Sequence, residues 1–313
     1  MLSGSRLALE VPRGFRLGRA VCSYGYFLLA PNHWDPKAKA FETVLRVGGE
    51  GRVGVRVTEA GSGRGLLIRC GERLNRDHQG EVKGQVGRML RVDEDLRDWW
   101  RLNPEAKKRG FGRLFRSATM WEDLVKTVTG CNTTWTSTIR MNKLLVEHVG
   151  KGGFPTAGEV ARFGAKRLKE VCKVGYRAER IEGLARGVLA GEIDAGWYES
   201  DERTEEEVLA ELRKLHGIGP YAAANMAQLL GHYDTLAIDT ETYRHFCLTQ
   251  GVERPKNPKL LEPMIEAYYE PMRPYRFLAY WFELWRDYER RVGPAEGWDR
   301  ERDGGSFTAS LLS

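Results

Sequence analysis

The chain has little cysteine, and the few cysteines it has are scattered. Among its 313 residues there are five, an odd number, and no two of them form a Cys-x-x-Cys pair. They are Cys22, Cys70, Cys131, Cys172 and Cys247. Disulfide frameworks and structural zinc sites need cysteines in even numbers or at close spacing. The sequence therefore argues against both kinds of site and fits a reducing, intracellular compartment.

Long hydrophobic runs are also missing. The N-terminal segment, MLSGSRLALEVPRGF, contains no extended apolar stretch, and no later segment approaches the length of a membrane-spanning helix. We therefore expect a soluble, monomeric protein of the cytoplasm or nucleoid, or of the nucleus in a eukaryote, with no membrane partner.

The charge balance is only mildly basic. Lys and Arg together number 49, and Asp and Glu 43, which gives a formal net charge of +6. Such a balance is compatible with a polyanionic partner, but it more often reflects surface solvation than a nucleic-acid footprint. With 42% hydrophobic and 29% charged residues, a chain of 313 residues can bury a full core, and we expect two closely packed sub-domains.

Up to about residue 100 the sequence is typical of β-structure. Apolar stretches at Ala20–Ala30, Val53–Val57 and Leu66–Cys70 are separated by glycine-rich turns, GGEG and GSGRG. A charged connector with a basic face, PEAKKRGFGRLFR (Pro104–Arg116), follows. We predict a β-rich N-terminal sub-domain over residues 1–100.

From Trp121 onward the apolar residues recur at helical spacing, and no internal repeat is visible. Helices are predicted over Trp121–Gly130, Thr138–Gly150, Ala165–Val174, Ala178–Leu189, Thr204–Leu215, Pro220–Leu230 and Tyr275–Arg291. The order of elements predicts an α+β fold, with a helical domain over residues 101–300 and a poorly ordered tail over residues 301–313.

The most informative segment is a pair of helices joined by the hairpin HGIGP, His216–Pro220. Gly217 and Gly219 allow the backbone to turn tightly and to approach another molecule closely. The N–H groups of the turn, from His216 through Ile218 to Gly219, and the start of the next helix can hold a phosphate oxygen. Such a contact positions a nucleic-acid backbone without reading its sequence. Taken alone, the pattern also fits a plain helical pair with a glycine turn.

A carboxylate follows the hairpin at a fixed distance. Asp239 lies 20 residues after Gly219 (239 − 219 = 20), behind the apolar run Leu236–Ile238 and before a helix start, TETYRHF. In isolation Asp239 could be only an N-cap, which contributes roughly 1 kcal/mol to a helix.

The two features together resemble a known superfamily. LHGIGPYAAANMAQL…LAIDTETYRHF is similar to the signature of the helix-hairpin-helix (HhH-GPD) DNA glycosylases, and the β-rich start resembles the layout of their 8-oxoguanine and alkyladenine-type members. The resemblance implies a mostly helical glycosylase core that binds double-stranded DNA with a lesion or mismatch. It also implies that Asp239 is the catalytic carboxylate. Breaking an N-glycosidic bond builds positive charge on the sugar, which a carboxylate stabilises.

The position of a lyase nucleophile is occupied by tyrosine. Bifunctional members of the superfamily carry a lysine two residues after the second hairpin glycine, where this chain has Tyr221. Tyrosine cannot form a Schiff base, so the resemblance implies a monofunctional enzyme that uses water. Tyr221 either lines the base pocket or packs in the core. A catalytically silent binder of distorted DNA, and a lyase that uses another lysine such as Lys173, remain alternatives.

Two further segments extend the resemblance. GYRA (Gly175–Ala178) is similar to the GYRAR segment of 8-oxoguanine glycosylases, which implies that Tyr176 wedges between bases and that Arg177 contacts the unpaired base. Asn132 falls where these families place an amide that enters the vacated space. One position departs from the 8-oxoguanine pattern, because Ser137 stands where that family has an arginine. The alternatives are a surface Tyr-Arg pair and a turn asparagine.

The final predicted helix is rich in aromatic residues. It lies where the 8-oxoguanine family places its pocket residues, and we take Trp281 and Phe282 as pocket candidates and most of the other aromatics as core. The iron–sulfur cluster of the endonuclease III branch needs four clustered cysteines near the C-terminus, whereas the last cysteine here is Cys247. We therefore expect no cofactor, no cluster and no metal.

Overall fold

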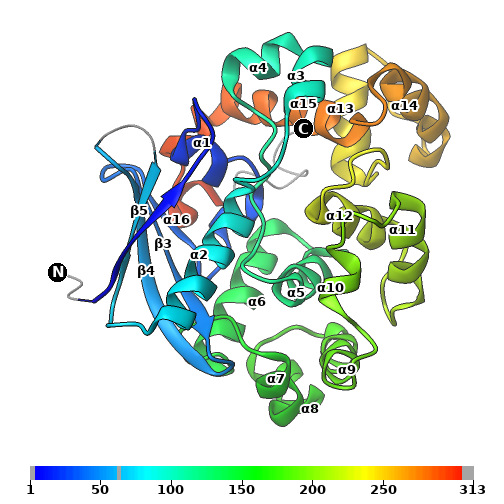
Figure 1. Ribbon diagram of the computed structural model, residues 1–313. Coiled ribbons are helices and arrows are strands. Elements are labelled where there is room, and N and C mark those ends of the chain that lie inside the picture. The colour runs from blue at the N-terminus through cyan, green and yellow to red at the C-terminus, as the bar shows by residue number, and fades with distance from the viewer. Residues whose placement is uncertain (1–3, 62–64, 305–313) are drawn as a thin grey trace.

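The computed structural model describes residues 4–61 and 65–304 of the chain. The middle of the predicted GSGRG turn and most of the predicted tail, residues 305–313, lie outside the described residues. Figure 1 shows the sheet on one side of the molecule and the helices of the later chain on the other.

Five strands form one antiparallel sheet in the order β1-β5-β4-β3-β2. The strands are β1 (Arg6–Glu10), β2 (His33–Asp35), β3 (Ala40–Val47), β4 (Gly51–Glu59) and β5 (Gly65–Cys70). The predicted alternation holds in β4, where Val53, Val55 and Val57 are buried and the residues between them are more exposed. One face of the sheet is therefore apolar, and α2 (Arg76–Leu90) packs against it between the strands and the later helices (Figure 1).

The prediction of β-structure was wrong for two parts of the first hundred residues. Ala20–Ala30 contains the end of α1 (Leu17–Val21) and the 3-10 helix η1 (Gly25–Leu28), and the chain after Cys70 is helical in α2 and α3 (Arg97–Leu102). Val21, Phe27 and Leu29 are all almost fully buried. A short run that is buried on every side shows no periodicity, so the sequence pattern could not distinguish helix from strand.

The helices predicted after Trp121 are confirmed, with bounds that differ by a few residues. The helical part comprises α4 (Pro104–Arg109), α5 (Met120–Gly130), α6 (Trp135–His148), α7 (Ala157–Phe163), α8 (Ala165–Val171), α9 (Arg177–Leu189), α10 (Ala195–Tyr198), α11 (Glu205–Lys214), α12 (Pro220–Leu230), α13 (Thr240–Gln250), η2 (Pro258–Leu261), α14 (Glu262–Tyr269), η3 (Glu270–Met272), α15 (Arg276–Val292), η4 (Ala295–Gly297) and α16 (Arg300–Asp303). With the sheet, they make the α+β fold that the order of elements predicted.

Local capping explains where the two hairpin helices begin and end. Thr204 and Glu207 form a reciprocal capping box at the start of α11, and Pro220 occupies the first turn of α12. Gly231 ends α12 with a φ of +107°, a conformation that favours glycine. These signals are local, so they were readable from the sequence.

One buried core continues from the sheet into the helices. It includes Leu7 on β1 and Trp298 near the end of the described chain, and Phe41 of β3 meets Phe115 edge to face with 5.3 Å between ring centroids. The boundaries predicted at residues 100 and 300 stay predictions.

A buried arginine joins the sheet side of this core to the hairpin helices. Arg91 at the C-cap of α2 donates from Nη2 to the carbonyl oxygens of Gln228 and Leu229, both at 2.8 Å, and from Nε to Leu114 at 2.7 Å. Two of these three acceptors belong to the last turn of α12, whose carbonyls have no partner within the helix.

We predict that Arg91→Met lowers the free energy of unfolding by about 3 kcal/mol, because three buried hydrogen bonds are lost and the Leu114 carbonyl is left without a donor. The Leu229 carbonyl still accepts from Arg116, and that of Gln228 from the Gly231 amide. Urea denaturation of the variant measures this, with Arg69→Met on the exposed side of β5 as the matched control. The control should stay within about 0.5 kcal/mol of the unaltered chain. Equal stability of the two variants would show that Arg91 does not hold α12.

Candidate active site

Asp239 lies at the N-terminus of α13, and its two carboxylate oxygens have different surroundings. Oδ1 accepts hydrogen bonds from the backbone N–H groups of Glu241 and Thr242, both at 2.9 Å, and from the Thr242 hydroxyl at 3.1 Å. The N-cap alternative is therefore correct as far as it goes. Oδ2 accepts no hydrogen bond from the described residues, and the side chain lines a cavity. Capping thus holds one oxygen and leaves the other available to a ligand.

The surroundings of Asp239 disfavour its charge. The carboxylate keeps some open surface in the cavity, but protein atoms enclose it closely, and this burial raises its pKa. The hydrogen bonds from Thr242 and from the Glu241 amide act in the opposite direction and lower the pKa, without cancelling the effect of burial. The site therefore holds a poorly solvated carboxylate in a fixed orientation.

The cavity beside Asp239 has a volume of about 150 Å³. Its aromatic walls are formed by Tyr24, Tyr26, Trp135, Tyr221, Phe277, Tyr280, Trp281, Trp285 and Tyr288. A second hollow of about 340 Å³ shares Asp239, Tyr221 and Trp135 as walls. Flat rings around a small space, with a carboxylate at the edge, suit a planar heterocycle held by stacking.

Helix α15 supplies most of these rings from one face. Trp281 stacks on Trp285 with centroids 5.4 Å apart, and Tyr24 packs on the other side of Trp281 at 4.8 Å. Both indoles are fixed from the N-terminal part of the chain, because Trp281 donates to the carbonyl oxygen of Ser23 at 2.9 Å and Trp285 to that of Cys22 at 3.0 Å. The rings therefore have defined positions.

The predicted pocket residue Phe282 does not line this cavity. Its ring packs instead against Phe111, 5.1 Å away, on another face of α15. Each helical residue is rotated by about 100° from the one before it, and this rotation turns Phe282 away from the face of α15 that carries Trp281 and Trp285. Helical spacing from Trp281 would have indicated Trp285 and Tyr288, which do line the cavity.

The sequence left open whether Tyr221 lines the base pocket or packs in the core, and in the structure its side chain does both. It lines the cavity while packing against the core, and burial, with the nearby Asp239 carboxylate, raises its pKa well above the ordinary value. One turn later on α12, Asn225 accepts a hydrogen bond from Tyr24 at 2.7 Å and donates to Thr127 at 3.1 Å. Sequence reasoning missed this polar wall, because its members come from three distant segments.

A second carboxylate, Glu241, was also missed. It lines the cavity next to Asp239 and accepts hydrogen bonds from the Tyr288 hydroxyl at 2.9 Å and from Arg244 Nε at 2.8 Å. In the sequence, the segment DTET (residues 239–242) indicates only the start of a helix, so it did not identify Glu241 as part of the site. Because the arginine neutralises Glu241, the carboxylate with a free oxygen in this wall is Asp239.

The hairpin has three backbone N–H groups without a partner. Among the described residues, the amides of His216, Gly217 and Gly219 form no hydrogen bond, and Gly217 has a φ of +84°. The Ile218 amide, in contrast, donates to the Leu215 carbonyl at 3.0 Å, and its side chain is buried. The predicted phosphate contact can therefore come from His216 and the two glycines, but not from the amide of Ile218.

The structure brings the predicted wedge residues together. Tyr176 is 50% exposed at the N-cap of α9, and Asn132, with a φ of +49°, lies exposed in the loop between α5 and α6. Arg177 links them but has a different place from the predicted one. It is only 7% exposed, and its Nη2 donates to the carbonyl oxygens of Cys131 and Asn132. Its burial argues against contact with an unpaired base and makes Arg177 a residue that holds the Asn132 loop.

Comparison with known proteins gives similarity in structure alone. No protein-family model matches this sequence, and neither does any curated protein sequence. Among solved structures, the 3-methyladenine DNA glycosylase of Archaeoglobus fulgidus superposes with a TM-score of 0.69 at 16% identity, over 90% of this chain and 98% of that one. The 8-oxoguanine glycosylase/lyase of Clostridium acetobutylicum, in complex with double-stranded DNA, gives 0.59 at 17% identity, over 85% and 92%. The Schizosaccharomyces pombe 3-methyladenine DNA glycosylase, in complex with abasic DNA, gives 0.50 at 18% identity, over 68% and 98%.

The chain has the DNA glycosylase fold. The superpositions with the 3-methyladenine and the 8-oxoguanine enzymes cover most of this chain and of each neighbour, so they include both the sheet and the helical part. This result agrees with the resemblance that the hairpin and Asp239 carry in the sequence.

Within this glycosylase fold, one lysine approaches the cavity region. Lys126 on α5 is among the residues around the larger hollow, but its side chain is fully buried and Nζ donates to Glu122 Oε1 at 2.5 Å. The rings of Tyr26 and Phe154 cover the ammonium, 5.8 and 5.5 Å from it. Lys173, the lysine considered from the sequence, is exposed and is not among the residues that line either hollow.

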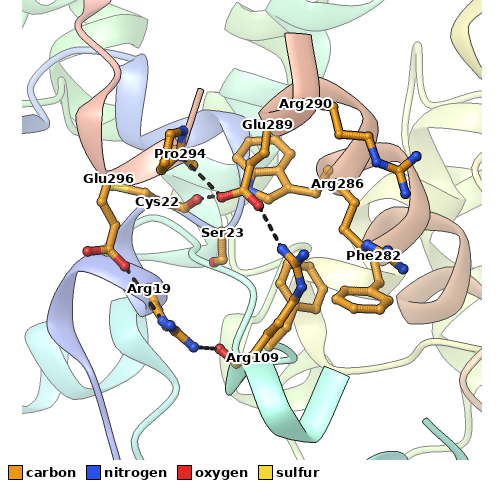
Figure 2. A pocket seen from close by; sticks show the side chains of 13 residues that line it. Arg19, Cys22, Ser23, Arg109, Phe282, Arg286, Glu289, Arg290, Pro294 and Glu296 are labelled. Carbon is orange, nitrogen blue, oxygen red and sulfur yellow. Dashed lines mark hydrogen bonds and ion pairs between the residues drawn. The ribbon is translucent and has the colours of Figure 1, made fainter. Parts of the chain in front are cut away.

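A larger cavity of about 380 Å³ lies on the far side of Trp285 from Asp239, and Figure 2 shows it. Its two glutamates face arginines, with Arg109 on Glu289 at 3.3 Å and Arg19 near Glu296 at 3.7 Å (Figure 2). Its volume exceeds that of the aromatic cavity, but both of its carboxylates are neutralised by these arginines, and of the predicted site residues only Phe282 lines it.

The basic connector contributes to internal packing. Arg116 donates to the Leu229 carbonyl at 3.0 Å, and Arg113 donates to the carbonyl of Arg91. These two arginines therefore hold backbone groups of the protein, whereas Lys107, Lys108 and Arg109 of the same stretch are exposed, and Arg109 is paired with Glu289.

Within residues 4–61 and 65–304, no group of three or more His, Cys, Asp or Glu side chains is arranged to hold a metal ion. Over the same residues, no helix combines the length and the apolar character needed to cross a membrane.

Proposed function

We propose that the protein is a monofunctional DNA glycosylase that releases a damaged or mispaired base from duplex DNA by hydrolysis. The observation that carries this proposal is the free Oδ2 of Asp239 at the edge of an aromatic cavity. Fold neighbours described as DNA glycosylases, two of them solved with DNA, support glycosylase activity on DNA. A mere DNA-binding protein would have no use for a carboxylate held in a poorly solvated wall.

On this proposal each part of the site has a role. The glycines of the hairpin hold a phosphate, Tyr176 and Asn132 fill the space in the duplex, and the extruded base enters between the rings of Tyr24, Trp281 and their neighbours. As the bond between C1′ and the base nitrogen breaks, its electron pair leaves with the base. The Asp239 carboxylate stabilises the positive charge on the sugar and orients a water molecule. Water adds to C1′, and its proton passes to the carboxylate and then to solvent.

The nature of the walls favours one class of base. Aromatic faces attract cations, and the open carboxylate oxygen of Asp239 adds negative potential. Purines that carry a methyl group on a ring nitrogen are positively charged and leave easily. We therefore place methylated purines first, ahead of 8-oxoguanine, hypoxanthine and uracil, and duplexes that carry each of these bases test the order.

We predict that Asp239→Asn abolishes base release, by a factor on the order of 10² or more, while duplex binding stays within a few-fold. Asparagine keeps the cap and the size of the side chain but removes the charge. Because a poorly solvated charge is lost, the thermal midpoint should not fall. Single-turnover release on the best substrate and a melting curve measure the two effects. Near-full turnover of the variant would make Asp239 a cap without a catalytic role.

A pH prediction follows from the environment of Asp239. The carboxylate must be ionised to act, and burial raises its pKa, so the rate should decrease at a pH above the range of an ordinary aspartate as the solution is acidified. Thr242→Val removes a hydroxyl that lowers this pKa and should move the acid limb to still higher pH. Thr242→Ser keeps the hydroxyl and should leave the limb in place. Identical limbs in all three proteins would mean that another group titrates.

Product strands should remain intact until alkali is added, and borohydride should trap no covalent protein–DNA adduct. The reason is that Tyr221 occupies the position of the lyase nucleophile, while Lys126 is covered and paired with Glu122. A strong adduct that disappears in Lys126→Met or Lys173→Met would identify the amine and place the protein among the lyases.

A further inference from the structure

Arg180 on α9 lies between the hairpin and Tyr176, and no carboxylate of the described residues forms an ion pair with it. Its guanidinium forms no hydrogen bond and no ion pair with any described residue, although the side chain is only partly exposed. Its neighbours on the same helix behave differently, since Arg177 is bonded to two carbonyls and Arg186 pairs with Glu182. An arginine that is held in place but unpaired is ready to bind an anion.

The side chain of Arg180 lies directly on the hairpin backbone. A Cβ built on Gly217 would stand 2.4 Å from Arg180 Cδ and 2.9 Å from its Nε, closer than any real side chain tolerates. The φ of +84° favours glycine at 217, and a side chain at this position would also displace Arg180. The contact places the Arg180 side chain against Gly217, two residues before Gly219 in the same hairpin.

The same guanidinium packs on the proposed wedge. The Arg180 Cζ lies 4.8 Å from the centroid of the Tyr176 ring, and Arg177 Cζ lies 4.6 Å from it. Because Arg177 in turn holds the Asn132 carbonyl, one line of contacts runs from the hairpin through Arg180 and Tyr176 to the Asn132 loop. The positive charges of Arg177 and Arg180 also reach Cys131, next to Asn132, where they oppose the rise in thiol pKa that burial causes.

We propose that Arg180 binds the DNA phosphate that the hairpin holds, and that this contact positions Tyr176 for insertion into the duplex. The proposal rests on the proposed function in that the ligand is duplex DNA. A guanidinium can give two parallel hydrogen bonds to one phosphate, and the glycine amides supply further donors from the other side. With its N–H groups bonded to the phosphate, the flat face of the Arg180 guanidinium supports the Tyr176 ring. Arg180 is thus a positioning residue, and the reacting atoms are elsewhere.

The experiment measures how duplex affinity depends on salt. We use undamaged duplex and duplex with an abasic-site analogue, so that binding is observed whether or not the protein releases a base. Arg180→Met keeps the apolar stem without the charge and should reduce the slope of log K against log salt by about 0.9, one phosphate contact. Arg186→Met is the matched control on the same helix and should leave the slope unchanged, because that arginine is already paired.

A second variant separates phosphate binding from support of the wedge. Arg180→Lys keeps the charge but loses the planar group that packs on Tyr176, so the salt slope should be retained. Extrusion, followed by 2-aminopurine fluorescence next to the target base, should slow several-fold in Arg180→Lys and in Tyr176→Ala, and the double variant should be no slower than Tyr176→Ala alone. Additive defects would disprove the coupling.

Other outcomes divide the two proposals. An unchanged slope and affinity in Arg180→Met, with a lower thermal midpoint, would show that Arg180 only braces the hairpin, and the inference would be wrong. A reduced slope in a protein that releases none of the tested bases would support Arg180 as a phosphate ligand and overturn the proposed function. Base release by the unaltered chain, with an unchanged salt slope in Arg180→Met, would support the proposed function and overturn Arg180 as a phosphate ligand.

Discussion

Two hydrogen bonds between distant ends of the chain hold the candidate site together. The indoles of Trp281 and Trp285 on α15 donate to the carbonyls of Ser23 and Cys22, and the Tyr24 ring then covers Trp281. The cavity exists because α15 is docked there, since its walls come from the start, the middle and the end of the chain. Because each of these bonds joins a side chain of α15 to the backbone of the N-terminal part of the chain, the two bonds fix the orientation of α15 as well as its position.

Asp239 shows how the site sets function against stability. A solvated aspartate would cap α13 equally well and would cost less, because burial here disfavours the charged form. The hydrogen bonds on Oδ1 recover part of this cost and also prevent the side chain from rotating away from the cavity. A carboxylate that is fixed and poorly solvated interacts strongly with positive charge that develops close by. The cap therefore serves as the device that orients the reactive group.

The sequence predicted those parts of the structure whose causes are local. The capping box at Thr204 and the hairpin-to-Asp239 spacing were readable because each depends on a few neighbouring residues. The helical form of Ala20–Ala30, the outward position of Phe282 and the burial of Arg177 were not, because packing against remote segments decides them. A motif gives residue types at a site, but the direction of each side chain depends on tertiary contacts.

Helix α12 explains how binding of the backbone and chemistry on the base can belong to one process. Its first turn carries the free amide of Gly219 toward the proposed phosphate, while Tyr221 in the same turn lines the cavity and Asn225 one turn later forms its polar wall. Arg91 holds the C-terminal end of α12 by hydrogen bonds to two of its last carbonyls. Because α12 is a rigid helix held at its C-terminus, it fixes the distance between the proposed phosphate site and the cavity. If the hairpin binds the phosphate of an extruded nucleotide, this fixed distance therefore places the sugar of that nucleotide next to Asp239.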